Sequence, residues 1–513
     1  MTPPFRRILV ANRGEIAIRV MRACRELGIE SVAVFSDADR DAPHVRAADR
    51  AEWIGPTPAT ESYLDVEAVI GAARRVGAEA IHPGYGFLSE SAAFARAVED
   101  AGLVFVGPPA ETMEGLGDKL AARRTAVAAG VAVTPGLLVA AGEARDGELD
   151  ALGYPLLVKA AAGGGGRGVR RVDGRDELAD AVDAARREAE AAFGDGTVYI
   201  EKLIAPARHV EVQLLGDRHG NLAVLGERDC SVQRRHQKLV EEAPAPRLRP
   251  ETRDGLAADA RRVAEAVAFH SAATVEFLVD ADENRWFLEM NTRLQVEHGV
   301  TELVSGVDIV AWQIRVAAGE RLSDEVLAAT PRGHAIQVRL YAEDPWNGFA
   351  PMPGRLGAWT MPDGPGIRVD GGVEAGLELP TAYDALLAKL MVHAPDRDAA
   401  VTRLRRALDE TAIGGVPTTL GFHRWLVDQP DFIEGRHDLR FVATTWGSGP
   451  PLADGDAGQA AAAVVQALGA ARPPGPMAGV AGSAQAGVPL PVDGQRPWTR
   501  QARAEAVERD PEQ

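Results

Sequence analysis

Short apolar runs alternate with amphipathic helical patterns over residues 6 to about 115, and few folds accept that alternation. The apolar runs include I-L-V-A at 8–11 and L-V-F-V-G at 103–107, and helical patterns occur at 15–27, 65–76 and 91–101. Repeated βαβ units predict a doubly wound, Rossmann-like parallel sheet. The turn N-R-G-E at 12–15 has a single glycine, so the fingerprint G-x-G-x-x-G is absent and NAD binding is not expected.

Composition limits the classes of protein to consider. With 513 residues, 46% hydrophobic and 25% charged, the chain should form roughly three soluble globular domains. The net charge of −18 argues against nucleic-acid and anionic-membrane partners. Only Cys24 and Cys230 are present, which suits a reducing cytoplasm and excludes a disulfide framework. Apolar runs are too short for a membrane span or a signal peptide, so we expect a cytoplasmic protein.

Lysine is rare in this chain. Five of the 56 basic residues are lysines and the rest are arginines. A chain that uses arginine for generic positive charge keeps lysine where a compact, flexible ammonium is needed. The five are Lys119, Lys159, Lys202, Lys238 and Lys389. The first four lie beside the motifs below, whereas for Lys389, in an apolar run, chance is an equally good explanation.

A glycine-rich stretch predicts a phosphate-binding lid. Residues 154–169 read as a strand with Lys159, followed by glycines at 163–166 and 168. Glycine backbones can close on phosphate oxygens without side-chain obstruction, and Lys159 would add a point charge. No G-K-[ST] follows, so this is not a P-loop, and a flexible linker remains the alternative. The next apolar strand, at 198–204, would offer its backbone to an adenine edge.

The stretch W-F-L-E-M-N-T-R-L-Q-V-E-H at 286–298 predicts a strand that pairs with the apolar strand at 274–280. Alternation would place Glu289, Asn291 and Arg293 on one face. Glu289 and Asn291, with Glu276 of the other strand, would form a cage of hard oxygen ligands for Mg²⁺, and Arg293 would add a cation beside it. Glu297 is a candidate general base. The alternative is a surface hairpin with a charged, solvated face.

The remaining regions are less specific. The polar run at 227–238 is typical of a solvated loop, and Cys230 within it is better explained as a small buried residue than as a nucleophile. Residues 332–441 read as a mainly β unit with terminal helices. From 447 the chain is rich in Ala, Gly and Pro, which predicts a weakly ordered or partner-dependent tail.

Nine ordered motifs between residues 6 and 441 resemble those of the biotin carboxylase family of the ATP-grasp superfamily. They are A-N-R-G-E-I-A-I-R at 11–19, H-P-G-Y-G-F-L-S-E at 82–90, G-D-K at 117–119, K-A-A-A-G-G-G-G-R-G at 159–168, R-H-V-E-V-Q at 208–213, R-D-C-S-V-Q-R-R-H-Q-K at 228–238, E-E-A-P at 241–244, E-M-N-T-R-L-Q-V-E-H at 289–298 and R-L-Y-A-E-D-P at 339–345.

This resemblance implies a fold of mixed α/β and α+β class. We expect a biotin carboxylase N-terminal α/β domain at 1–115 and an ATP-grasp domain at 116–320 with a lid at about 132–204. A C-terminal, β-rich biotin carboxylase domain would follow at 332–441, and the tail would occupy 447–513.

The resemblance also assigns site residues. The family's ATP positions correspond to Lys119, Lys159, Gly163, Gly164, Gly165, Gly166, Glu201, Lys202, Ile204, His209, Gln233 and His236. Its metal positions, for Mg²⁺ or Mn²⁺, correspond to Glu276, Glu289 and Asn291. Its bicarbonate site corresponds to Lys238, Arg293, Gln295, Val296 and Glu297, and its biotin site to Arg339.

The implied reaction is the first half-reaction of an acyl-CoA carboxylase, such as the acetyl-CoA or propionyl-CoA enzymes of fatty acid metabolism. Glu297 would deprotonate bicarbonate, which attacks Mg·ATP to give carboxyphosphate and ADP, and Arg339 would stabilise the biotin enolate during N-carboxylation. The biotin carrier motif A-M-K-M is absent. Biotin is therefore expected on a separate biotin carboxyl carrier protein or domain. The other expected partners are a carboxyltransferase and a second copy of the chain in a homodimer.

The sequence departs from the family pattern in two places, and two other interpretations of its function remain. Gly299 stands where the family usually has proline, and Ala382-Tyr383-Asp384 replaces the more usual aromatic pair. The same half-reaction could belong to a pyruvate or urea carboxylase. A non-catalytic scaffold paralogue is the alternative of a different class, although the matched catalytic positions are all occupied.

Overall fold

The computed structural model describes residues 3–117, 119–139, 146–160, 169–193, 196–447 and 449. The predicted tail at 447–513 therefore lies almost entirely outside the described residues, and the prediction about it remains untested. Among the described residues, no helix is both long and apolar enough to span a membrane.

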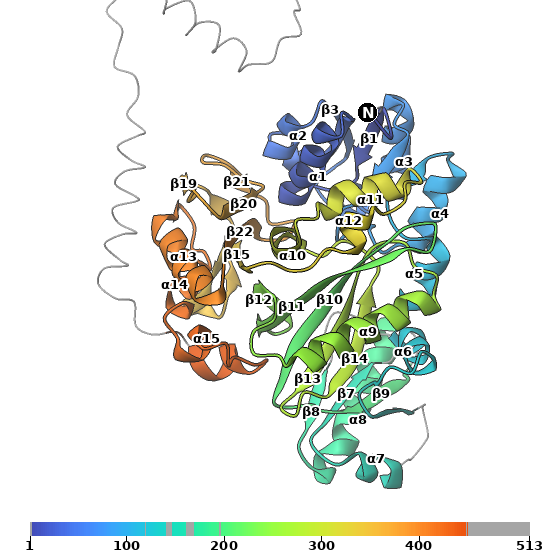
Figure 1. Cartoon of the computed structure of the whole chain (residues 1–513), viewed down its shortest axis with the longest axis vertical. Coiled ribbons are helices and arrows are strands. Elements are labelled where there is room, and N and C mark those ends of the chain that lie inside the picture. Colours follow the sequence, from blue (N-terminus) through green and yellow to red (C-terminus); the bar gives the residue numbers. More distant parts are fainter. Residues whose placement is uncertain are drawn as a thin grey trace, which may run out of the picture. The chain divides into compact units, whose positions relative to one another are not determined.

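The first 117 residues form the predicted parallel sheet (Figure 1). Its strand order is β3 (Arg50–Gly55), β2 (Glu30–Ser36), β1 (Arg7–Val10), β4 (Ala80–His82) and β5 (Val104–Phe105). Its helices are α1 (Gly14–Glu26), α2 (Pro43–Ala47), α3 (Val66–Val76), α4 (Ala92–Asp100) and α5 (Ala110–Gly117). The predicted helix starts are off by one residue because Asp65 and Ser91 are N-caps, whose side chains accept from the backbone N–H groups of Ala68 and Phe94.

An eight-stranded sheet is the largest sheet of the described residues (Figure 1). Its order is β14 (Arg285–Asn291), β13 (Ser271–Asp280), β10 (Ala207–Gly216), β11 (Leu222–Arg234), β12 (Gln237–Ala243), β15 (His334–Tyr341), β22 (Leu386–Ala394) and β20 (Ile367–Gly371). All of its strand pairs are antiparallel. The sheet therefore runs without interruption from the ATP-grasp region into the predicted C-terminal domain, since β12 pairs with β15.

Helices pack against this sheet near both of its ends. Helices α6 (Lys119–Ala128) and α9 (Pro250–Ala266) pack apolar residues against β10 and β13. The helices of the C-terminal part include α13 (Arg397–Glu410), α14 (Leu420–Leu426) and α15 (Pro430–Ile433), and their apolar residues pack with those of β15 and β22. Helices α10 (His298–Ser305), α11 (Ile309–Ala317) and α12 (Asp324–Leu327) follow the predicted metal hairpin.

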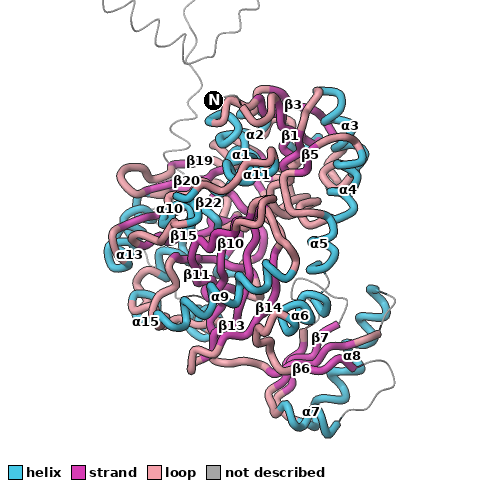
Figure 2. Tube along the Cα trace, turned by 45° about the vertical axis from the view of Figure 1, so that its right-hand side comes forward, coloured by secondary structure: helices cyan, strands magenta, loops and turns pink. Residues whose placement is uncertain are grey.

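The predicted lid contains a small sheet of its own (Figure 2). Its order is β6 (Gly136–Val139), β9 (Val198–Lys202), β7 (Leu156–Ala160) and β8 (Arg170–Val172), with helices α7 (Asp146–Leu152) and α8 (Arg175–Phe193). Apolar residues of these strands and helices form a separate core cluster that includes Leu156, Val158 and Ile200. The lid thus has its own core, whereas its glycines at 163–166 lie outside the described residues.

Two sequence expectations in the polar regions were wrong. The strand at 286–298 ends at Asn291, and Arg293 lies beyond it. A bulge at Leu288 also breaks the expected alternation: Glu276 pairs with Glu289, but Phe277 pairs with Phe287, and Phe287 and Met290 both enter the core. The run at 227–238 is not a solvated loop, because most of it belongs to the buried hairpin of β11 and β12.

Candidate active site

Glu297 lies between two cations contributed by neighbouring strands of the eight-stranded sheet. Lys238 on β12 donates from Nζ to Glu297 Oε1 over 2.7 Å, and Arg339 on β15 donates from Nη2 to Oε2 over 2.9 Å. The Glu297 carboxylate is 1% exposed, so both contacts are shielded from water. The predicted base and two predicted cations therefore meet at one point.

Two further carboxylates balance these cations. Glu211 on β10 accepts from Lys238 Nζ over 2.6 Å, and Glu241 on β12 accepts from Arg339 Nε over 2.5 Å. Both are fully buried. Neither was assigned a role from the sequence, although each lies inside a motif that carried the resemblance.

The electrostatics keep Glu297 ionised. Burial alone would raise the pKa of Glu297, but the nearby Lys238, Arg339 and Arg228 charges hold that pKa well below its usual value. Burial alone would lower the pKa of Lys238, but Glu211, Glu276 and Glu297 raise it well above normal. The site thus contains a charged carboxylate and a charged ammonium in direct contact, with little water around them.

The predicted metal ligands converge on the hairpin of β13 and β14. The Asn291 side-chain amide lies 2.9 Å from Glu276 Oε1 and 3.4 Å from Glu289 Oε1. Glu276 and Asn291 are buried. The two carboxylates supply the hard oxygen donors that suit a Mg²⁺ ion. The Asn291 Nδ2 faces these carboxylates, and its Oδ1, which here accepts from Arg293, is the oxygen that would join them around the ion.

Glu276 connects this group with the rest of the site. Its Oε1 also accepts from Lys238 Nζ over 3.1 Å and from Gln295 Nε2 over 3.1 Å. Its Oε2 lies 2.8 Å from His209 Nε2 on β10. Burial alone would lower the pKa of His209, but Glu276 raises it. Gln233 on β11 contacts His209 Nδ1 at 3.2 Å, so of the two predicted ATP residues His209 adjoins the metal group directly and Gln233 adjoins His209.

Arg293 occupies a position between the metal group and the N-terminal domain. It donates to Gln295 Oε1 over 2.7 Å and to Asn291 Oδ1 over 3.3 Å. Its Nε donates over 2.9 Å to Glu90, which ends the H-P-G-Y-G-F-L-S-E motif and was not assigned a role from the sequence. Arg293 therefore connects the metal group with the loop that follows β4.

Two of the predicted nucleotide residues of the lid contact each other, and a third contacts the backbone. Lys159 on β7 donates to Glu201 on β9 over 2.6 Å, and Lys202 donates to the carbonyls of Gly153 and Tyr154 over 3.0 and 2.8 Å. Ile204 follows β9 and is partly exposed. His236 lies at the tip of the β11–β12 hairpin with φ +68°. Gly163 to Gly166 and the Lys119 side chain lie outside what the structure describes, so their assignments stay predictions.

A cavity of about 520 Å³ lies beside this network, between the N-terminal and C-terminal parts of the chain. Its wall includes the predicted residues Arg293, Val296 and Arg339, and also Tyr85, which was not assigned a role from the sequence. Ala382 lines the same cavity, so the departure from the aromatic pair falls at its wall.

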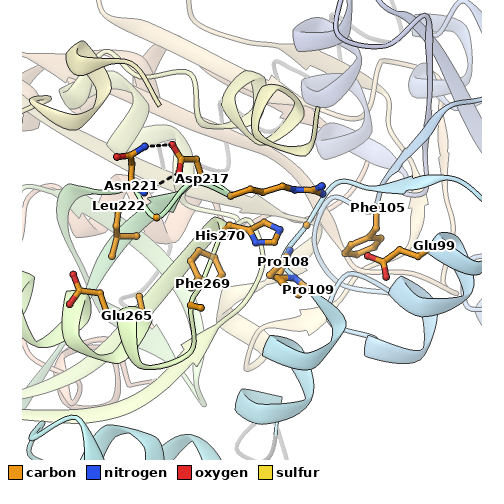
Figure 3. Close-up of a pocket in the computed structure, with 15 residues that line it drawn as sticks. Glu99, Phe105, Pro108, Pro109, Asp217, Asn221, Leu222, Glu265, Phe269 and His270 are labelled. Carbon is orange, nitrogen blue, oxygen red and sulfur yellow. Dashed lines mark hydrogen bonds between the residues drawn. The ribbon is translucent and has the colours of Figure 1, made fainter. Parts of the chain in front are cut away.

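A second cavity, of about 530 Å³, shares no lining residue with the first (Figure 3). It is lined by residues such as Glu99, Asp217 and His270, and no predicted site residue belongs to its wall. The candidate active site is therefore the space beside Arg339 and Arg293.

Gly299, the other departure from the family pattern, lies in the first turn of α10. A Cβ atom at this position would overlap Sδ of Met391 on β22 and lie 3.3 Å from its Cε. Met391 is fully buried. The space that a larger residue at 299 would need is therefore occupied by the methionine.

Comparison with known families covers nearly all of the described chain. The model described as "Biotin carboxylase, N-terminal domain" matches residues 4–113, and "Biotin carboxylase C-terminal domain" matches 337–444. "Carbamoyl-phosphate synthase L chain, ATP binding domain" matches 118–325. A biotin carboxylase of Nostoc sp. is 48% identical over 444 residues, which is 85% of this chain and 98% of that protein. The chain belongs to the biotin carboxylase family. The resemblance of the nine motifs is thereby confirmed.

Related proteins and solved structures agree with this assignment. A pyruvate carboxylase subunit of Methanothermobacter thermautotrophicus is 47% identical over 85% of this chain and 89% of its own. A Campylobacter jejuni biotin carboxylase structure superposes with a TM-score of 0.82 at 44% identity, covering 86% and 98% of the two chains. A Hydrogenobacter thermophilus 2-oxoglutarate carboxylase domain, described as a dimer with MgADP, ADP and bicarbonate, gives 0.80 at 46% identity and covers 86% and 97%. The predicted fold class is confirmed.

Proposed function

We propose that this biotin carboxylase carries out the ATP-dependent carboxylation of biotin on a separate carrier polypeptide, as the first half-reaction of an acyl-CoA carboxylase. The observation that carries the proposal is the contact of Glu297 with Lys238 and Arg339 beside a cavity. Activation of a small anion requires a base to take its proton, cations to offset its charge and a space in which it can bind.

In this proposal the Glu297 carboxylate takes the proton of bicarbonate. Lys238 and Arg293 attract the anion, and Lys238 offsets the charge of the attacking oxygen. When bicarbonate draws Lys238 away from Glu297, the base loses a stabilising partner and its proton affinity rises. Arg339, which contacts both Glu297 and the cavity, would then stabilise the biotin enolate.

Glu276, Glu289 and Asn291 would bind Mg²⁺, which supplies charge neutralisation on the phosphates. His209 and Gln233 adjoin them and would contact the nucleotide, together with Lys159, Glu201 and Lys202 of the lid. We propose the same domain bounds that the sequence predicts. The solved dimer with MgADP and bicarbonate supports these ligands and a homodimer.

The acyl acceptor depends on a carboxyltransferase. Methylcrotonoyl-CoA and propionyl-CoA carboxylase α chains resemble this chain at 49% and 45% identity, and a pyruvate carboxylase subunit does so at 47%. A pyruvate carboxylase is therefore the second candidate. Identification of the biotinylated and transferase proteins that co-purify with the chain distinguishes the two.

The direct test is ATP cleavage by purified protein with and without bicarbonate and free biotin. We expect cleavage to require bicarbonate and to rise with biotin. Glu297→Gln should reduce turnover by about 10²- to 10⁴-fold while ATP still binds. ATP hydrolysis that is independent of bicarbonate would refute the proposed activity, and full turnover in the variant would remove Glu297 as the base.

A further inference from the structure

Lys389, the lysine that no motif explained, is fully buried on β22. Its Nζ donates to the backbone carbonyl of Val296 over 3.0 Å. The same ammonium lies 3.1 Å from Glu15 Oε2 and 3.8 Å from Asp370 Oδ2. A buried cation is costly unless it is paired, and here one lysine is paired on three sides.

These partners come from three parts of the chain. Glu15 lies in the first turn of α1 in the N-terminal domain, Asp370 lies on β20 of the C-terminal part, and Val296 directly precedes Glu297. Tyr85 completes the group, because its hydroxyl donates to Glu15 and its ring centre lies 5.8 Å from Lys389 Nζ. Lys389 thus brings the residue directly before the base into contact with groups of both neighbouring domains.

The same face of β22 supports the base segment a second time. Side chains at alternate positions of a strand share a face, so Lys389 and Met391 point the same way. Lys389 contacts the chain at 296, and Met391 occupies the space beside Gly299. The turn between β14 and α10, which contains Glu297, therefore rests on two side chains of one strand.

We infer that Lys389 is a positioning residue for the reaction: its ammonium fixes the Val296 carbonyl and so keeps Glu297 between Lys238 and Arg339. This inference rests on the proposed role of Glu297. Lys389 acts through the backbone, since its ammonium bonds the Val296 carbonyl and not the Glu297 carboxylate. Arginine, with its larger planar head group, does not reproduce a compact ammonium with three donors.

The test compares Lys389→Met with Arg397→Met. Arg397 on α13 is a matched control, because its guanidinium donates to Glu242 over 2.7 Å and to the Phe432 carbonyl over 2.7 Å. Each variant loses a largely buried cation bonded to a carboxylate and a carbonyl, but only Lys389 contacts the base segment. Misplacement of a catalytic group by about 1 Å can cost about 10²-fold in rate.

We expect Lys389→Met to lower kcat for bicarbonate-dependent ATP cleavage by about 10- to 100-fold, with the KM for ATP within about twofold of wild type. Arg397→Met should lower Tm and leave kcat within about twofold of wild type. Lys389→Gln keeps an N–H donor and should restore part of kcat. Equal kcat in the wild type and in a folded Lys389→Met variant would overturn the inference.

If Lys389→Met does not fold, Lys389→Gln and Lys389→Arg are measured in the same way. Both should then show lower kcat at unchanged KM for ATP, and wild-type kcat in both would overturn the inference. A wild-type protein without bicarbonate-dependent cleavage would instead refute the proposed function. The two failures are therefore distinguishable.

Discussion

Gly299 packs against Met391, and we predict that enlarging Gly299 destabilises the protein unless Met391 is shortened. In Gly299→Ala the new Cβ overlaps Met391 Sδ, and Arg368 Cζ lies 3.7 Å away on another side. Met391 is fully buried within a small core cluster, so its thioether has little free space to enter. The methionine side chain must move away from this position, or α10 must shift.

The size of the effect follows from two opposing contributions. Replacing glycine by alanine inside a helix stabilises the folded state by about 0.5–1 kcal/mol. Overpacking a close-packed core costs about 1–3 kcal/mol. For Gly299→Ala we therefore expect a net loss of about 1 kcal/mol. Once Met391→Ala has removed the thioether, the overlap disappears and the same substitution should become stabilising.

A double-mutant cycle measures this coupling. Thermal unfolding of wild type, Gly299→Ala, Met391→Ala and the double variant gives four Tm values, with about 2 °C expected per kcal/mol. Met391→Ala alone should cost about 2–5 kcal/mol. The second substitution should then recover part of this loss, with a coupling of about 1–3 kcal/mol. Additive Tm shifts, or a stabilised Gly299→Ala single variant, would refute the packing argument.

Three further predictions concern the metal group, the lid and an ion pair of the C-terminal part. Glu289→Gln should raise the Mg²⁺ concentration for half-maximal ATP cleavage at least about tenfold, and an unchanged Mg²⁺ requirement would remove Glu289 from the ligand set. Lys159→Met should raise the KM for ATP about tenfold or more and leave the KM for bicarbonate within about twofold; equal changes in both would contradict a nucleotide role. Burial alone would raise the pKa of Glu242, but Arg397, His334 and His437 hold that pKa at about 2 in the folded protein. The ionised Glu242 therefore stabilises the folded state at pH values above the pKa of an unfolded glutamate, and this stabilisation is lost as the pH falls toward 2. Between about pH 5 and pH 3 the Tm of the wild type should accordingly fall more than the Tm of Glu242→Gln. If the Tm of both proteins fell in parallel with pH, the Glu242 carboxylate would contribute nothing to the pH dependence of stability.

The fold was largely predictable from the sequence because its signals are local. Alternating apolar runs and N-caps such as Asp65 and Ser91 place the predicted N-terminal elements to within one or two residues, whereas α2 and β3 were not predicted. The alternation of the hairpin was not predictable across Leu288, because a bulge inserts one residue there without any mark in the sequence.

The candidate site was predictable in its members but less so in its contacts. The sequence motifs identified Glu297, Lys238 and Arg339 as site residues. They assigned no role in the site to Glu211 and Glu241, which balance the charges of the two cations. A carboxylate's partner is chosen by strand register across the sheet, and register depends on contacts far apart in the sequence. Lys389 was ambiguous for the same reason, because its partners lie on three separate segments.

The eight-stranded sheet has a consequence for anyone who shortens this chain. The predicted C-terminal domain at 332–441 looks separable in the sequence, but β15 is the strand that pairs with β12 on that side. Removing residues after 331 would leave β12, with Lys238 and Glu241, as a bare sheet edge with unpaired backbone groups. Such an edge is a template for self-association. We therefore expect the isolated ATP-grasp region to aggregate rather than to remain as a soluble, nucleotide-binding half.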